Sequence, residues 1–250
     1  MPGDYNSFSL FVAAIIRNLQ YICPRKFNMR IAMQAAISAD IVSSTSLSPK
    51  EIVMLQAKIN ETIIMLEERY EGFWGRLVKG DYIECVVPEP NAALRAALLL
   101  KTAVKSLNIS KDSRTQQFRK YGMRLAIGLA DMRLVDRKKD IMDGDAIYYS
   151  GRAVDSMHSE NKCSFVVVGK NKEYSMLLTT ITTLVDSILN GATRRQSEVF
   201  YYKLLSMKES DIASLLSITQ SGVNQRASVA GWSCLETAVN CFEQINFSRI

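Results

Sequence analysis

The spacing of apolar positions predicts where the chain forms strands and where it forms helices. Residues 31–46, IAMQAAISADIVSSTS, form an apolar run that ends in small polar residues, which is typical of a buried strand leading into a helix. Ser48, Pro49 and Glu51 follow as a helix start, because a serine cap, a proline at the first position and a glutamate three residues after the cap favour helix initiation. Apolar residues at helical spacing then predict a helix to about Tyr70.

The rest of the first 190 residues continues this alternation of strands and helices. Strands are predicted at residues 73–77 and 82–87, joined by a tight turn at 79–81, and later at 123–129 and 164–168. Helices are predicted at residues 92–107 with Asn91 as cap, at 146–158 and at 176–190, with a polar linker at 111–120 and a charged loop at 131–140. The order β-α-β-β-α-β is that of a ferredoxin-like domain, so the predicted fold class is α+β.

From Arg194 onward the pattern is helical only. Helices are predicted at residues 198–206, 209–216, 220–230 and 232–245. We therefore expect three parts, which are an N-terminal extension (1–30), a ferredoxin-like domain (31–190) and a small all-α domain (194–250).

The segment 211–223, DIASLLSITQSGV, predicts a helix-turn-helix. Ile212, Leu215, Ile218 and Val223 are placed to form its small core, and Thr219 is placed to cap the second helix. The exposed start of that helix carries side chains that hydrogen-bond to base edges and phosphates. The predicted DNA-binding residues are Gln220, Ser221, Asn224, Gln225 and Arg226.

The charge of this segment limits its predicted affinity for DNA. Over residues 194–250 the basic side chains (Arg194, Arg195, Lys203, Lys208, Arg226, Arg249) nearly balance the acidic ones (Glu198, Glu209, Asp211, Glu236, Glu243). Such a balance predicts weak non-specific binding. DNA binding is the favoured interpretation, and a helical module for protein interaction or dimerisation stays open.

Composition narrows the chemistry and the compartment. The 250 residues are 48% hydrophobic with a net charge of +6, as in an ordinary globular protein. Five cysteines are scattered without a metal-binding spacing, which fits a reducing cytoplasm. The apolar run 8–16 is too short to span a membrane and lacks the features of a signal peptide. Because His158 is the single histidine, catalysis would have to use carboxylates, a metal and arginine.

Two aspartates occupy positions where a metal could bind. Asp40 ends the first strand and Asp81 lies in the predicted hairpin, and these elements lie side by side in a ferredoxin-like sheet. Two carboxylates placed there can converge on Mg²⁺ or Mn²⁺ that bridges a nucleoside triphosphate. The simpler interpretation, a structural cap for Asp40 and a turn residue for Asp81, stays open.

Four segments resemble class III nucleotide cyclases. They are ISADIVSST (37–45), KGD (79–81), YGMRLAIGL (121–129) and GDAIYYSGR (144–152). The resemblance implies that Asp40 and Asp81 bind metal and that Arg152 matches the catalytic arginine. It also implies a nucleotide-binding loop, for which the candidate residues are Ser43, Ser44, Thr45 and Lys79.

The chain also departs from the cyclases. Tyr148 stands where the family has its catalytic asparagine, and Leu77 stands where it has the lysine that selects the base. A closer resemblance, over residues 30–245, is to the SatD family of small bacterial proteins. The segments 142–157 (MDGDAIYYSGRAVDSM) and 211–232 (DIASLLSITQSGVNQRASVAGW) are similar to that family, which implies a degenerate cyclase-like domain followed by a helix-turn-helix.

Together these patterns predict a cytoplasmic, homodimeric bacterial regulator that binds DNA and uses its cyclase-like domain for sensing or dimerisation. The domain would bind a nucleotide with Mg²⁺ or Mn²⁺, and catalysis is not favoured. Two other classes stay open: an active nucleotidyl cyclase with Arg152 as catalytic residue, and a non-catalytic interaction scaffold.

Overall fold

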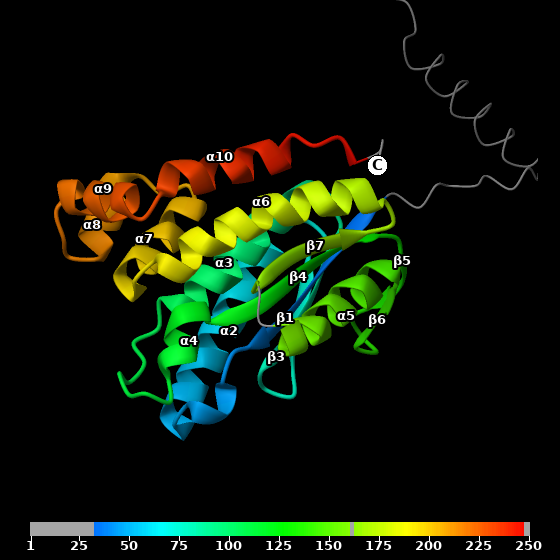
Figure 1. Cartoon of the computed structure of the whole chain (residues 1–250), viewed down its shortest axis with the longest axis horizontal. Helices are drawn as coiled ribbons and strands as arrows, with labels where there is room; N and C mark the ends of the chain where they lie inside the picture. Colours follow the sequence, from blue (N-terminus) through cyan, green and yellow to red (C-terminus); the bar gives the residue numbers. More distant parts are fainter. Residues whose placement is uncertain (1–32, 161–162, 248–250) are drawn as a thin grey trace, which may run out of the picture. The chain divides into compact units, whose positions relative to one another are not determined.

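The central sheet has five strands in the order β2-β3-β1-β4-β7 (Figure 1). The computed structural model describes residues 33–160 and 163–247, with only the backbone of 158–160, so the predicted extension 1–30 lies outside the described residues. The strands are β1 (Gln34–Ile41), β2 (Trp74–Val78), β3 (Tyr82–Val87), β4 (Met123–Ala130) and β7 (Phe165–Gly169).

The first four strands and two helices form the predicted ferredoxin-like arrangement. Neighbouring strands among β1 to β4 are antiparallel. Helix α2 (Pro49–Arg69) connects β1 to β2, and α3 (Ala93–Lys105) follows β3 after the short helix η2 (Pro90–Ala92). Strand β7 adds a parallel neighbour to β4 at the edge of the sheet. The predicted α+β fold class is confirmed.

The two faces of the sheet are covered by different helices. Ile37 and Ala39 of β1 belong to the large core that α2 and α3 share. Ala36 and Ser38, on the opposite face, pack against α5 (Asp145–Glu160). This second layer is very close, because a Cβ added to Gly128 of β4 would lie 2.0 Å from the carbonyl oxygen of Ala146 in α5.

Three local predictions were wrong. The linker 111–120 contains the start of a short helix, α4 (Gln116–Tyr121), and the charged loop 131–140 contributes to a hairpin of β5 (Met132–Asp136) and β6 (Ile141–Gly144). The hairpin was missed because most of β5 is solvent-exposed, so its apolar residues do not alternate. Asn91 does not cap α3, since its side chain donates instead to the backbone carbonyls of Glu243 and Ile245.

The C-terminal helices pack against strand β7, helix η2 and helix α3 of the sheet unit, which is residues 33–169. Helix α6 (Lys172–Gly191) follows β7, and the remaining helices are α7 (Arg194–Leu204), α8 (Glu209–Leu215), α9 (Gln220–Val229) and α10 (Trp232–Glu243). Arg95 of α3 forms an ion pair with Glu243 at 2.5 Å and donates to the carbonyl of Leu204 at 2.9 Å. One hydrophobic core therefore continues from the sheet into the helices.

Two helix starts agree with the sequence. Ser48 and Glu51 form the predicted capping box of α2. Thr219 accepts a hydrogen bond from the Gly222 amide and so caps α9. Among the helices that the structure describes, none combines the length and apolar character needed to cross a bilayer.

Candidate functional site

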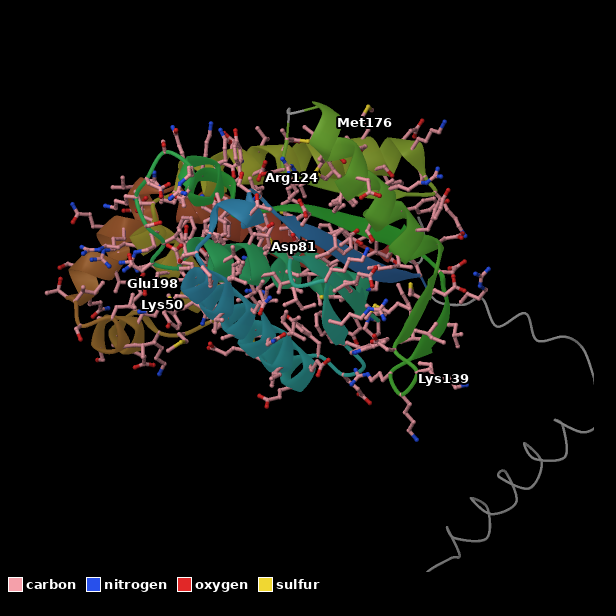
Figure 2. The ribbon with its side chains drawn as sticks, turned by 90° about the horizontal axis from the view of Figure 1, so that it is seen from below. Lys50, Asp81, Arg124, Lys139, Met176 and Glu198 are labelled. Carbon is pink, nitrogen blue, oxygen red and sulfur yellow. The ribbon has the colours of Figure 1, made fainter. Side chains whose placement is uncertain are left out.

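The two predicted metal ligands come together at one end of the sheet. The Ile41 amide donates to the Asp81 carbonyl at 3.0 Å, and Asp40 stands opposite Tyr82 in the β1–β3 register. The main chains of Asp40 and Asp81 are thus neighbours, although 40 residues of sequence separate them. Figure 2 shows Asp81, at the β2–β3 turn, and Arg124 of β4 in the same region.

Each carboxylate already has a protein partner. Ser44 donates its hydroxyl to Oδ2 of Asp81 at 2.8 Å. Arg124 stands opposite Asp40 in the β1–β4 register, and its guanidinium lies 3.3 Å from Oδ2 of Asp40. Arg124 was not among the predicted site residues. The signal was available, because a charged residue within the otherwise apolar strand MRLAIGLA requires a partner.

The donor set fits a metal that arrives with a nucleotide better than a resident metal. Within the described ranges no group of three or more His, Cys, Asp or Glu side chains could hold an ion. Mg²⁺ is commonly bound by one or two carboxylates together with substrate phosphates. Asp40 and Asp81 would supply such carboxylates, and Arg124 would then have to share Asp40 with the metal.

The predicted nucleotide-binding residues lie in two turns beside the aspartates. Ser43 has a left-handed backbone (φ 54°) and begins the short helix η1 (Ser44–Ser46). Lys79 is also left-handed (φ 52°) and exposed, at the turn that carries Asp81. The structure therefore brings Ser43, Ser44 and Lys79 to the end of the sheet that carries both carboxylates, and Thr45, in the same short helix, is exposed.

Arg152 lies on the solvent side of α5. Ser150 faces the sheet and makes a buried hydrogen bond of 2.7 Å with Ser38, while Arg152 is exposed. The Arg152 guanidinium stacks 4.7 Å from the ring centre of Tyr148, which is 52% exposed. The two residues that match the catalytic positions of the cyclases therefore contact each other.

A cavity of about 840 Å³ adjoins Ser43 at the end of β1. Tyr121, Arg124 and Asn190 are among its lining residues. Oδ1 of Asn190 is buried and, within the part of the chain that the structure describes, has no hydrogen-bond partner. The cavity was not predicted, because its wall combines β1, α4, β4 and α6, which are distant in sequence.

A buried ion pair lies beside this cavity. Nζ of Lys101 is 3.0 Å from Oδ1 of Asp186, and the two side chains are 0% and 4% exposed. Ser164 and the Met123 carbonyl complete the network. Burial alone would raise the pKa of Asp186, but Lys101 and the hydrogen bonds from Ser164 outweigh it and lower that pKa. The carboxyl group is therefore ionised at neutral pH.

The second predicted site is the pair α8 and α9. A four-residue connection, 216–219, joins the helices, and Ser217 within it has a left-handed backbone (φ 52°). Ile212, Val223 and Ala227 are buried, and Trp232 packs on Phe200 of α7 at 5.6 Å between ring centres. Ile212 and Val223 are thus buried as predicted, but the prediction for Leu215 was wrong, because this last residue of α8 is 56% exposed.

The predicted DNA-binding residues lie on the outer face of α9. Gln220, Ser221, Asn224 and Gln225 are exposed, and Arg226 is half-buried. Figure 1 shows α8 and α9 at the end of the described unit opposite to β5 and β6. The polar face is therefore clear of the sheet.

Comparison with solved structures finds nucleotide cyclases. A bacterial light-regulated adenylyl cyclase is 15% identical, with a TM-score of 0.38, over 64% of this chain and 54% of its own. The guanylyl cyclase Cya2 is 14% identical (TM-score 0.33; 50% of this chain, 70% of that chain). Adenylate cyclases from Trypanosoma brucei are 17% identical (TM-score 0.36; 57% and 75%).

These similarities concern the fold. The match spans about half the length of the light-regulated cyclase, and at these scores it says nothing about activity. No protein-family model and no curated protein matches the chain. The fold itself is an α+β domain of ferredoxin-like topology with additional helices.

Proposed function

We propose that this protein is a DNA-binding bacterial regulator of the SatD family, in which α9 is the recognition helix and the cyclase-like domain is a non-catalytic sensory or dimerisation domain. The observation that carries the proposal is the division of α9 into two faces. Val223 and Ala227 pack into the core, while Gln220, Asn224 and Gln225 are exposed amides. Asparagine and glutamine can make bidentate hydrogen bonds to adenine in the major groove.

The charges near α9 indicate how DNA would be bound. Lys203 is engaged in an ion pair of 2.7 Å with Glu209 and lies over the Trp232 ring. Lys208, at the start of α8, is exposed. With so few cations available to phosphates, hydrogen bonds to bases would contribute a large share of the affinity, and non-specific binding would be weak.

Replacing two amides of α9 is expected to weaken specific DNA binding. The variant Gln220→Ala/Asn224→Ala should lose roughly 10- to 100-fold in affinity, since a bidentate base contact is worth about 1–3 kcal/mol. The duplex would first be selected from a random library with the wild-type protein, and binding would then be measured by fluorescence anisotropy. Asn240→Ala/Gln244→Ala removes the same residue types from exposed positions at the end of α10 and should bind normally.

Failure of the selection to enrich any duplex would contradict DNA binding. Equal losses in the two double variants would contradict the assignment of α9 as the recognition helix. Binding to another protein would then be the better-supported function of helices α7 to α10.

An active nucleotidyl cyclase is the second candidate, because Asp40 and Asp81 lie at the same end of the sheet. When bound there, Mg²⁺ or Mn²⁺ would neutralise triphosphate charge and activate the 3′-hydroxyl of the nucleotide. Arg152 would stabilise the charge that develops on the phosphoryl group. It lies on the solvent side of α5, so it would have to act across the interface of a homodimer.

We expect no cyclic nucleotide from the purified protein, because Tyr148 replaces the catalytic asparagine of the cyclases and stacks on Arg152. The protein would be incubated with each of the four nucleoside triphosphates and Mg²⁺ or Mn²⁺, and products would be identified by mass spectrometry. A cyclic product that disappears in Asp40→Ala would establish an enzyme instead.

Light scattering should find a dimer at micromolar concentration, and a strict monomer would contradict the proposed homodimer.

A further inference from the structure

A second cavity, of about 600 Å³, lies where the sheet unit meets α7. Its wall combines the loop after α3, helix α4 and the start of α7. The cationic lining residues are Lys105, Lys111, Arg119, Arg194 and Arg195. Among the described residues, no aspartate or glutamate lines this cavity. A hollow lined by one sign of charge concentrates counter-ions of the opposite sign.

The position of Lys105 shows that this site is built into the fold. Lys105 is 5% exposed, and its ammonium donates to the backbone carbonyls of Arg119 and Lys120 in α4. Burial, together with the nearby charge of Lys101, lowers the pKa of Lys105 to about 7. Lys105 therefore ties α3 to α4 in the wall of the cavity and carries only part of a positive charge near pH 7.

The carboxylates around the cavity neutralise only part of its positive charge. Asp112 binds the Arg114 side chain and the Thr115 amide, and only its backbone carbonyl accepts from Arg119. Glu198 forms an ion pair of 3.9 Å with Arg194 and so neutralises part of the charge of that residue. Arg195 is exposed. The cavity therefore retains positive charge that the neighbouring acidic groups do not neutralise.

The start of α7 adds to this positive potential. Helix α7 has 11 residues, and its capping box uses the amides of Thr193 and Gln196. The amides of Arg194 and Arg195 are in the first turn, where a helix provides no internal acceptor. A helix N-terminus of this kind attracts anions, and here it faces a cavity that is already cationic.

The cavity also has an apolar side. Leu107, Ile109 and Phe118 line it together with the cations. Its volume is in the range of sites for small organic ligands. A free inorganic ion would leave much of this space unused, whereas a phosphorylated organic molecule would use both sides.

We propose that this cavity binds a small organic phosphate with two or more phosphate groups, held by Arg119, Arg194 and Arg195, with its apolar part against Leu107 and Ile109. The bound ligand would join α4 of the sheet unit to α7, the helix that leads into the helix-turn-helix. The proposal concerns ligand binding and does not depend on whether α9 binds DNA.

The test uses inorganic tripolyphosphate as the probe and isothermal titration calorimetry on the full chain. Wild-type protein should bind one equivalent, and Arg119→Ala/Arg195→Ala should weaken binding at least about tenfold, since charge-assisted hydrogen bonds are the strong ones. Arg194 is retained because it both donates to the Ser106 carbonyl and forms an ion pair with Glu198. The matched control, Lys138→Ala/Lys139→Ala, removes two charges from the β5–β6 hairpin, where Figure 2 shows Lys139, and should change affinity less than about twofold.

Two further measurements separate a site from a general charge effect. Arg119→Lys/Arg195→Lys should recover part of the affinity, and ATP should compete with tripolyphosphate. The proposal would be overturned if both double alanine variants lost the same affinity for tripolyphosphate. Binding of several equivalents of tripolyphosphate at weak, non-specific sites would also overturn it. So would binding of a DNA duplex through Arg119 and Arg195 without binding of the free polyphosphate, because the cations would then contact the DNA backbone.

Discussion

Replacing Lys101 by methionine should lower the free energy of unfolding by about 3–5 kcal/mol, because it leaves Asp186 as an uncompensated buried charge. Lys101 is fully buried and Asp186 nearly so, and they lie 3.0 Å apart. Ser164 would still donate to the carboxylate but cannot supply a positive charge. Urea unfolding followed by tryptophan fluorescence would measure the loss.

The double variant Lys101→Met/Asp186→Leu is the informative control. Replacing both ions by apolar groups of similar size is often nearly neutral, so the double variant should be more stable than Lys101→Met alone. A double variant at least as unstable as the single one would show that the pair itself, and not the isolated charge, dominates. If Lys101→Met unfolded at the same urea concentration as the wild type, the buried ion pair between Lys101 and Asp186 would be contradicted.

The lowered pKa of Asp186 sets the pH range of this effect. The folded state holds the carboxyl below its ordinary pKa of 3.8, so its contribution is complete above about pH 4 and is lost as the pH falls through the folded pKa. We therefore expect the difference between wild type and Lys101→Met to narrow in acid. The same urea titrations, repeated toward pH 3, would measure this narrowing.

Replacing Gly128 by alanine should cost about 3 kcal/mol or more, at the upper end of overpacking effects. The new Cβ would lie 2.0 Å from the Ala146 carbonyl oxygen and 3.0 Å from the Ser150 amide nitrogen. These are main-chain atoms of α5, so no side-chain rotation relieves the clash. Helix α5 would have to move away from β4, and the buried hydrogen bond between Ser38 and Ser150 would be lost.

Gly191→Ala is the matched control for this substitution. Gly191 ends α6, and a Cβ there meets nothing within 4 Å. That variant should be neutral or slightly stabilised, since alanine is the better helix former. Chemical unfolding of both variants would compare them directly. If Gly128→Ala kept wild-type stability, the close approach of α5 to the sheet would be wrong.

The elements that could be predicted are those with a clear period or a strong cap. The apolar strands and α2, with its Ser48–Glu51 box, follow from side-chain spacing and local hydrogen bonding. The β5–β6 hairpin could not be found in this way, because Met132 is the one buried residue of its two strands, so no continuous buried face imposes alternation. Asn91 looked like a cap but binds the end of α10, 152 residues away.

The candidate sites were only partly predictable for a related reason. Asp40, Asp81 and the polar face of α9 are visible because they occupy characteristic places within one element. Arg124, Lys101 and Asp186 acquire their roles through partners on other elements, so only the folded chain connects them. The basic cavity likewise needs three segments, from α3 to α7, to exist at all.

The attachment of α10 has a consequence for how α9 could be used. The chain enters the helical segment through α7, packed on α3, and returns through α10, whose end is held by Asn91 and Arg95. Helix α9 is thus held by packed helices on both sides and does not hang on a flexible linker. In a homodimer the distance and the orientation between the two copies of α9 would then be fixed. One extra base pair between half-sites rotates the second by roughly 35°, so such a protein would tolerate little variation in operator spacing.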